Sequence, residues 1–85
     1  MSLSQTETEN ELKDFIAKEL LEGKEIGLDA STPLIEWGLI DSLSLMQVLT
    51  FVEKRFGRKL PYGELTATNL KDIRAITQLI LRTSA

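Results

Sequence analysis

The spacing of apolar residues predicts helices along most of this chain. The first apolar stripe recurs every three or four positions and consists of Leu12, Phe15, Ile16 and Leu20. Ser4 with Glu7, or Thr8 with Glu11, can form a capping box ahead of this stripe, an arrangement that satisfies free backbone N–H groups where a helix starts. We therefore expect a helix over about residues 5–22, which the next glycine ends.

Further helices are predicted in the second half of the chain. One begins near Ser42 and ends at Gly57, and its core-facing stripe consists of Leu45, Val48, Leu49, Val52 and Phe56. Another follows Asp72, a residue type favoured as an N-cap, and its buried stripe consists of Ile73, Ile76, Leu79 and Ile80. A short helical turn is expected over 64–70, because Pro61 prevents the preceding structure from continuing. No β-strand pattern of any length is present, so the predicted fold class is all-α, a small antiparallel bundle of three main helices plus a short one.

A long loop joins the first two main helices. It opens on the turn residues of 29–33 and ends at Asp41. Loops of this length in compact domains are usually functional or held down by their own apolar residues. Those residues are here Leu28, Leu34, Ile35, Trp37 and Leu39. We expect Trp37 to pack within the loop, with a role in docking partners as the alternative.

The composition argues against a catalytic role for this chain. The 85 residues contain no histidine and no cysteine, so a serine has no imidazole to activate it, and the usual metal-ligand sets are missing. We expect one small domain over residues 1–85, with its core over about 8–82, that is not an enzyme and holds no metal permanently. The acidic N-terminus and the short apolar runs predict neither a signal peptide nor a membrane span, so we expect a cytoplasmic protein. We also expect it to be a monomer.

The charges are divided unevenly between the two halves of the chain. Residues 1–42 contain ten acids and three lysines, whereas residues 43–85 contain three acids and seven lysines and arginines. The basic residues are scattered and are not interleaved with aromatic ones, and the pI is about 4.9. We therefore expect two solvated faces of one bundle that attract each other weakly, and no nucleic-acid partner.

The pair Asp41-Ser42 stands at the start of the second main helix. Both residue types are favoured N-caps, so a purely structural role is one interpretation. However, a helix needs only one cap. If Asp41 caps the helix, the Ser42 hydroxyl is free to face solvent, and the positive helix end favours a phosphate ester attached there. Ser42 is therefore a candidate for modification by another enzyme.

The sequence around this pair resembles that of phosphopantetheine-dependent carrier proteins. The resemblance covers about residues 10–82 and is carried by four segments: 32–43, which ends in the core motif Asp-Ser-Leu, Phe56-Gly57, Leu60-Pro61 and 65–73. It implies an acyl-carrier-protein-like four-helix bundle in which a phosphopantetheinyl transferase uses coenzyme A to attach a phosphopantetheine arm to Ser42. It also implies that Asp41 helps to hold a magnesium ion in the transferase complex. The arm ends in a thiol, which carries acyl or aminoacyl groups between enzymes as thioesters.

Two departures from fatty-acid carriers narrow the subclass. Fatty-acid carriers usually have one residue between the glycine and the Asp-Ser pair, whereas two separate Gly38 from Asp41. This longer form resembles discrete carriers of aminoacyl and unusual acyl groups. The helix after Ser42 also holds a single acid, Glu53, as far as Arg55, so we expect docking to depend on apolar contact more than on charge.

The recognition positions of the family fall on Leu43, Met46 and Thr50 in this chain. Partial burial of Leu43 and Met46 under the loop is the alternative. The resemblance favours a carrier in a natural-product pathway of the nonribosomal-peptide or polyketide kind, loaded by an adenylating enzyme and served by tailoring or condensing enzymes. A D-alanyl or fatty-acid-type carrier is one alternative, and an unmodified helical interaction module is another. A hydrolase is nearly excluded, because Ser42 would lack a base.

Overall fold

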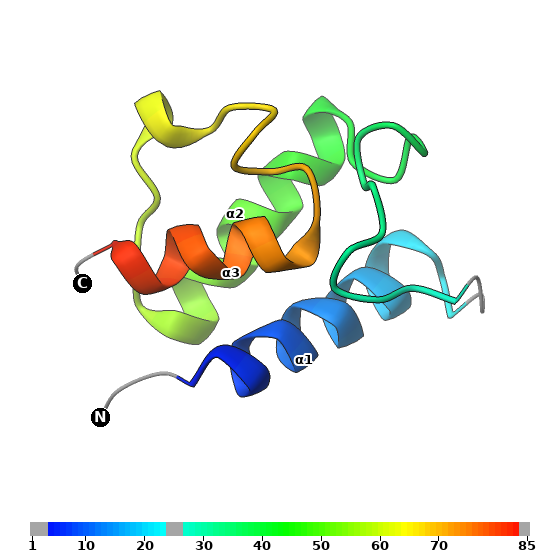
Figure 1. Ribbon diagram of the computed structural model, residues 1–85, viewed down its shortest axis with the longest axis horizontal. Coiled ribbons are helices and arrows are strands. Elements are labelled where there is room, and N and C mark those ends of the chain that lie inside the picture. Colours follow the sequence, from blue (N-terminus) through cyan, green and yellow to red (C-terminus); the bar gives the residue numbers. More distant parts are fainter. Residues whose placement is uncertain (1–3, 24–26, 84–85) are drawn as a thin grey trace.

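The computed structural model describes residues 4–23 and 27–83, and every regular element within them is helical (Figure 1). The elements are helix α1 over Gln5–Phe15, the π-helical turn η1 over Ile16–Leu20, helix α2 over Ser42–Phe56, the 3₁₀ turn η2 over Tyr62–Glu64 and helix α3 over Ile73–Arg82. This described part of the chain has no strand, so the all-α prediction of three main helices and a short one is confirmed. None of its helices combines the length and the apolar character that a membrane span requires.

Polar side chains at the helix starts explain where α1 and α3 begin. The Ser4 hydroxyl accepts the backbone N–H of Glu7 at 3.0 Å, and the Asp72 carboxylate accepts that of Ala75 at 2.7 Å. Each bond satisfies an N–H group that has no partner within its helix. Of the two capping boxes considered for α1, the structure uses the cap at Ser4. Thr8 lies inside the helix, where its hydroxyl donates to the Ser4 carbonyl at 2.8 Å.

The short helix lies earlier in the chain than expected. It was predicted over 64–70, but η2 begins directly after Pro61, and residues 66–70 form one separate turn in which the Leu70 N–H donates to the Thr66 carbonyl at 3.0 Å. Proline presets the φ angle for a helix start, and Pro61 has φ −65°. The prediction was therefore wrong in register, because the proline starts the turn that it was expected only to precede.

The main helices and the long loop share one apolar core. Its buried members are Leu12, Ile16, Leu28, Leu34, Ile40, Val48, Val52, Leu60, Leu70, Ile73, Ile76, Leu79 and Ile80. The whole predicted stripe of α3 is among them. From the stripe of α2, only Val48 and Val52 are fully buried, whereas Leu45, Leu49 and Phe56 pack against the edge of the core.

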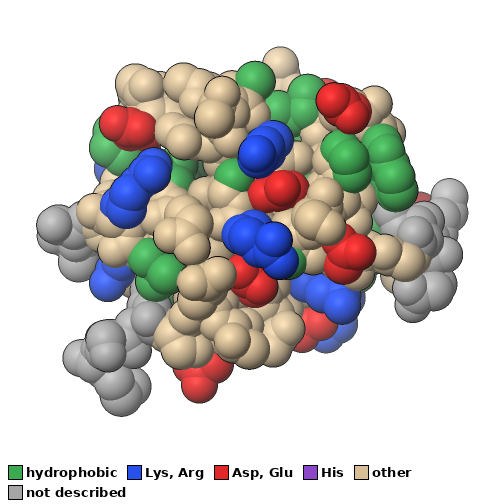
Figure 2. All heavy atoms as spheres, in the orientation of Figure 1, with side chains coloured by type: hydrophobic (Ala, Val, Ile, Leu, Met, Phe, Trp, Pro, Cys, Tyr) green, Lys and Arg blue, Asp and Glu red, His purple; other side chains and the backbone are tan. Residues whose placement is uncertain are grey.

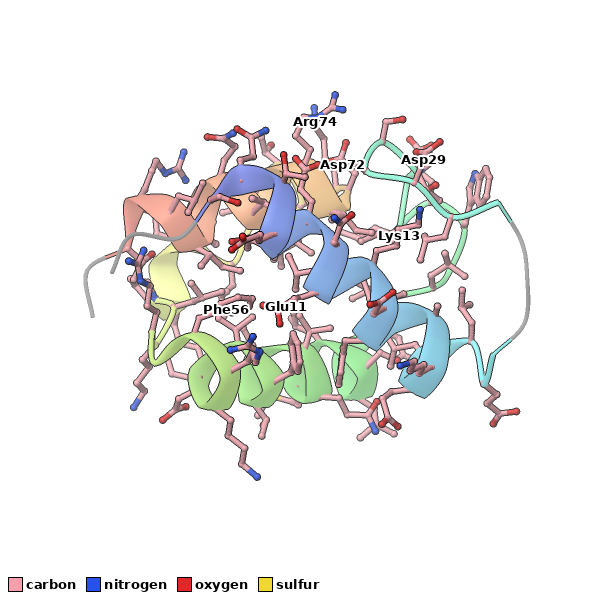
Figure 3. The ribbon with its side chains drawn as sticks, turned by 90° about the horizontal axis from the view of Figure 1, so that it is seen from below. Glu11, Lys13, Asp29, Phe56, Asp72 and Arg74 are labelled. Carbon is pink, nitrogen blue, oxygen red and sulfur yellow. The ribbon has the colours of Figure 1, made fainter. Side chains whose placement is uncertain are left out.

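Helix α1 lies against both other main helices (Figure 3). Phe15 of α1 stacks on Phe51 of α2 with ring centroids 4.3 Å apart and planes 18° apart. Near them, Arg55 Nε donates to Glu11 Oε1 at 2.7 Å. On the other side of α1, Arg74 of α3 lies 4.0 Å from a Glu9 carboxylate oxygen. The acidic and basic halves of the chain thus meet at exposed ion pairs, which contribute little to stability individually.

Backbone hydrogen bonds tie the long loop to the start of α3. The Arg74 N–H donates to the Ala30 carbonyl at 3.0 Å, and the Leu34 N–H donates to the Lys71 carbonyl at 2.8 Å. Leu34 is thereby held in the core. Trp37, however, is 56% exposed, so the expectation that it packs within the loop is wrong. The turn over 33–38 buries Leu34 on one side and leaves the indole on the solvent side.

Candidate modification site at the start of helix α2

Asp41 is the N-cap of α2. Its backbone is extended, with φ −118° and ψ −170°, and its carbonyl accepts the first helical N–H, that of Leu45, at 2.8 Å. Its carboxylate oxygen Oδ1 accepts the backbone N–H of Ser44 at 2.8 Å. This bond, followed by one from the Ser44 hydroxyl, holds the pKa of the Asp41 carboxyl below its usual value. The side chain is therefore a carboxylate, the charge that the helix start favours.

Ser42 is the first residue of α2 and is exposed to solvent. The Ser42 hydroxyl forms no hydrogen bond with any residue of 4–23 or 27–83. Asp41, not Ser42, caps the helix, because its carboxylate accepts the Ser44 N–H. A hydroxyl in this position is accessible to another enzyme. The chain has no histidine or cysteine that could activate this hydroxyl.

The end of the loop holds this pair in place. The Leu39 and Ile40 N–H groups both donate to the Leu34 carbonyl, at 2.8 and 3.3 Å. Gly38, just before them, has φ 71°, a conformation that only glycine adopts readily. Ile40 is buried, so the chain is anchored in the core one residue before Asp41. The glycine and the two buried residues Leu34 and Ile40 thus fix where the loop delivers Asp41-Ser42.

Large apolar side chains are exposed in the loop, on the first turns of α2 and in η2. The exposed fractions are 41% for Ile35, 56% for Trp37, 72% for Leu43, 54% for Met46 and 78% for Tyr62. Figure 2 shows apolar side chains gathered where the loop meets α2. Leu43 and Met46 are thus not covered by the loop, and the alternative of partial burial is wrong.

Thr50 and Tyr62 complete this surface on the side of η2. Thr50 is exposed, and its hydroxyl donates to the Met46 carbonyl at 3.0 Å. Tyr62 shares a small hollow of about 100 Å³ with Met46 and Leu49. The sequence interpretation missed Tyr62, although an aromatic residue directly after Pro61, at the start of a short surface turn, was the available signal.

No metal site can be built from this chain alone in its described part, where no three potential ligand side chains gather. Asp41 offers a single carboxylate, and one of its oxygens already accepts the Ser44 N–H. Magnesium demands near-octahedral oxygen coordination. Asp41 therefore fits a magnesium ion only as one ligand among several that another protein or the substrate supplies.

Comparison with known proteins identifies the family. The family model described as "Phosphopantetheine attachment site" matches residues 10–80. The chain is similar to the "Probable acyl carrier protein PigG" of Serratia sp. (strain ATCC 39006), with 27% identity over 77 residues that cover 91% of this chain and 88% of the relative. It is also similar to a chain in the structure named "Crystal structure of FAD-dependent dehydrogenase", with a TM-score of 0.78 and 35% identity over 81% of this chain and 97% of that one.

The family match includes the loop, the Asp41-Ser42 pair and the whole of α2. It confirms the resemblance seen in the sequence. Proteins of this family are carriers, not catalysts, and they work together with transferases and with the enzymes that process their cargo. The chain therefore belongs to the phosphopantetheine attachment site family, whose members carry a covalently attached phosphopantetheine arm.

Proposed function

We propose that Ser42 is the residue that bears the phosphopantetheine arm. The observation that carries this proposal is the division of roles at the start of α2, where Asp41 caps the helix and leaves the exposed Ser42 hydroxyl without a partner among the described residues. A phosphate attached to Ser42 would lie at the helix N-terminus, where free N–H groups and the helix dipole favour an anion.

The chemistry of attachment divides between this chain and the transferase. The Ser42 oxygen forms a bond to the phosphorus next to the pantetheine of coenzyme A, and the phosphoanhydride bond breaks to release adenosine bisphosphate. The hydroxyl proton goes to a base of the transferase, because this chain has no histidine or cysteine. The attached arm supplies a thiol for thioesters, while the chain keeps the cargo at a local concentration on the order of millimolar for a docked enzyme.

The attachment site is tested by intact mass after incubation with coenzyme A and a broad-specificity phosphopantetheinyl transferase. Ser42→Ala should abolish the mass increase and leave the helical circular dichroism unchanged. Ser31→Ala is a matched control, because Ser31 is also exposed and also lies near an aspartate, Asp29, to which it is hydrogen-bonded. Modification that persists in Ser42→Ala would contradict the assignment, and the absence of modification in the wild type would favour an unmodified interaction module.

We propose a second role for Asp41, as a magnesium ligand in the transferase complex. Asp41→Ala should weaken the start of α2 and also slow the transferase. Asp41→Asn separates the two effects, because an asparagine oxygen still accepts the Ser44 N–H but carries no charge for the metal. If Asp41→Asn is modified as fast as the wild type, the magnesium role is wrong.

We propose that the carrier serves a natural-product pathway of the nonribosomal-peptide or polyketide kind. The pathway is supported by the two residues between Gly38 and Asp41, and the similarity to the acyl carrier protein PigG supports the carrier role. The chain from the dehydrogenase structure is about as short as this one, since 81% of this chain covers 97% of it. We therefore include a flavin-dependent dehydrogenase among the proposed partners, acting on the thioester after an adenylating enzyme has loaded it.

A reconstituted loading assay tests the pathway. Adenylating enzymes encoded beside this chain should load an amino acid or a short acyl group onto the modified carrier, as seen by intact mass. A flavin dehydrogenase encoded there should then remove two hydrogens from the thioester and reduce its own FAD. Loading with D-alanine alone, or with long fatty acyl groups alone, would support the corresponding alternative instead.

Docking is proposed to depend on the apolar side chains around Ser42. Leu43 and Met46 are exposed, and α2 carries only Glu53 as an acid up to Arg55. Loading of the modified carrier should therefore change little with added salt, which screens exposed charges but not apolar contact. Met46→Glu should impair loading, whereas Gln78→Glu, the introduction of the same acid at an exposed site of α3, should not. A steep loss of loading with salt, with Met46→Glu tolerated, would show that charge steers the encounter.

A further inference from the structure

A groove runs between α1 with η1 and helix α2. It shares Thr50 with the proposed docking surface, but it is not lined by Leu43, Met46 or Trp37. Its floor is formed by the stacked rings of Phe15 and Phe51. The hollow has a volume of about 580 Å³ and is also lined by Glu19, Gln47, Thr50, Lys54 and Arg55. A second hollow of about 260 Å³ shares this floor and extends along α1 past Glu11, Asp14 and Lys18.

The two walls of this groove differ in charge. The wall from α1 and η1 carries Glu11, Asp14 and Glu19 beside Lys18, and the wall from α2 carries Lys54 and Arg55. Arg55 is bonded to Glu11 and connects the walls in the second hollow. In the described part of the chain, the side chains of Glu19, Gln47 and Lys54 make no hydrogen bond or ion pair. The groove thus has an aromatic floor between charges that are available to a ligand.

The wall at Glu19 belongs to a π-helical turn. Residues 16–20 adopt the wider π form, so the helix there does not keep the regular spacing of α1. Such turns are rare and often lie at functional sites. Phe15, which precedes the turn, and Phe51 remain half-buried despite their stacking.

The arm on Ser42 is not the natural occupant of this groove. On α2, Ser42 shares its helical row with Met46, Leu49 and Glu53, at spacings of four, seven and eleven residues. That row leads to the hollow beside Tyr62. Phe51 and Lys54 project from a different side of α2, toward α1. A phosphopantetheine arm that lies along the row of Met46 and Leu49 therefore points away from the groove.

A second copy of the chain is not the natural occupant either. The main hollow is lined by seven residues, too few for a stable dimer, which involves about 20–30 residues on each side, whereas a transient contact with a partner enzyme buries less surface. A groove of this size instead fits one or two turns of a helix that places apolar side chains on the floor. In this mode of recognition, apolar anchors recur at helical spacing and flanking charges set the orientation.

We propose that this groove docks an amphipathic helix of a partner enzyme. The apolar residues of that helix lie on Phe15 and Phe51, its acidic residues face Lys54 and its basic residues face Glu19. Because the groove lies on another side of α2 from the row of Ser42, a partner bound there holds the carrier and leaves Ser42, Leu43 and Met46 free for a second enzyme. Thr50 is the residue that the two surfaces share.

A synthetic helical peptide serves as the probe. It carries leucines at positions i, i+3, i+4 and i+7, glutamates along one flank and lysines along the other, and it is titrated into the ¹⁵N-labelled full-length carrier. Saturable NMR shift changes are expected at Phe15, Gln47, Phe51 and Lys54. Lys54→Glu and Glu19→Lys should each weaken binding about two- to fivefold, the range of an exposed charge pair.

The double variant Glu19→Lys with Lys54→Glu provides the sharpest test. It reverses both walls, and the peptide can then bind in the opposite direction, so affinity should return to near the wild-type value. Glu36→Lys and Lys71→Glu, at exposed sites outside the groove, are the matched controls and should leave binding unchanged. Phe51→Ala should abolish binding, and if it fails to fold, the charge variants still decide the question.

Several outcomes would overturn the proposal. Shift changes confined to Met46 and Tyr62 would place the peptide on the proposed docking surface instead. Equal binding by the wild type and both single charge variants would show that the walls do not select the helix. Shifts in the groove that grow with carrier concentration in the absence of peptide would make a second copy its occupant, and shifts there on loading the arm would make the cargo its occupant.

Discussion

Thr77 of α3 is fully buried, and no described residue forms a hydrogen bond with its hydroxyl oxygen. An unpaired buried hydroxyl costs about 1–3 kcal/mol in protein mutational data. Valine has nearly the same shape and a similar helix propensity, so Thr77→Val removes this cost while filling the same space. Allowing for small adjustments in packing, we expect the free energy of unfolding to rise by about 1 kcal/mol.

Urea unfolding followed by circular dichroism at the helical band measures this change. Small proteins have urea m-values at the low end of the usual range, about 1 kcal/mol/M. A gain of about 1 kcal/mol therefore raises the urea concentration at the unfolding midpoint by up to about 1 M. The thermal midpoint should rise by about 4–8 °C. The m-value should stay the same, because the variant exposes the same surface on unfolding.

Thr8→Val is the matched control. Thr8 is also buried, but its hydroxyl donates to the Ser4 carbonyl at 2.8 Å. The same substitution there removes a hydrogen bond and should lower the free energy of unfolding by about 0.5–1.5 kcal/mol. If Thr77→Val destabilises the protein as much as Thr8→Val does, the Thr77 hydroxyl has a partner in solution and the reasoning is refuted.

Three further predictions concern pH, a helix end and the loop. Hydrogen bonds from Ser44 lower the pKa of the Asp41 carboxyl in the folded protein. Its contribution to stability is therefore complete above the unfolded pKa of 3.8 and is lost as the pH falls through the lower folded pKa. In Asp41→Asn, the free energy of unfolding in urea should depend less on pH below about 4. Gly57 ends α2 at φ 67°, and a methyl group added there would meet no neighbouring atom. Gly57→Ala should therefore lower the free energy of unfolding by about 1 kcal/mol from backbone strain alone. Gly63→Ala, at a glycine without positive φ, is the control and should cost less in the same urea unfolding assay. Leu34→Ala should cost about 2–5 kcal/mol because its side chain is fully buried, and Trp37→Ala should cost much less; equal losses would contradict the burial described for the loop.

The helix boundaries that depend on local chemistry could be predicted from the sequence. Helix α2 runs over Ser42–Phe56 as expected, because Asp41 caps its start and Gly57 adopts the left-handed conformation that ends it. Helix α3 likewise follows its cap at Asp72. The Asp41-Ser42 pair was found for the same reason, since a capping residue and the free hydroxyl beside it are neighbours in the chain. Between Pro61 and Asp72 the local signals compete, and there the short helix was misplaced.

Tertiary structure decided which surfaces are covered. Trp37 lies in an apolar loop, yet the turn that buries Leu34 leaves it exposed, because backbone bonds to the start of α3 determine which side of the loop faces the core. Phe51 lies outside the predicted stripe of α2, and it is half-buried because Phe15 of α1 stacks on it and Phe56 packs against it edge to face. Periodicity identifies the apolar face of a helix, but the neighbour that covers it comes from a distant part of the chain. The sequence alone therefore predicted helix α2 and indicated Ser42 as the candidate attachment site, while the packing of α1 against α2 created the groove between these two helices.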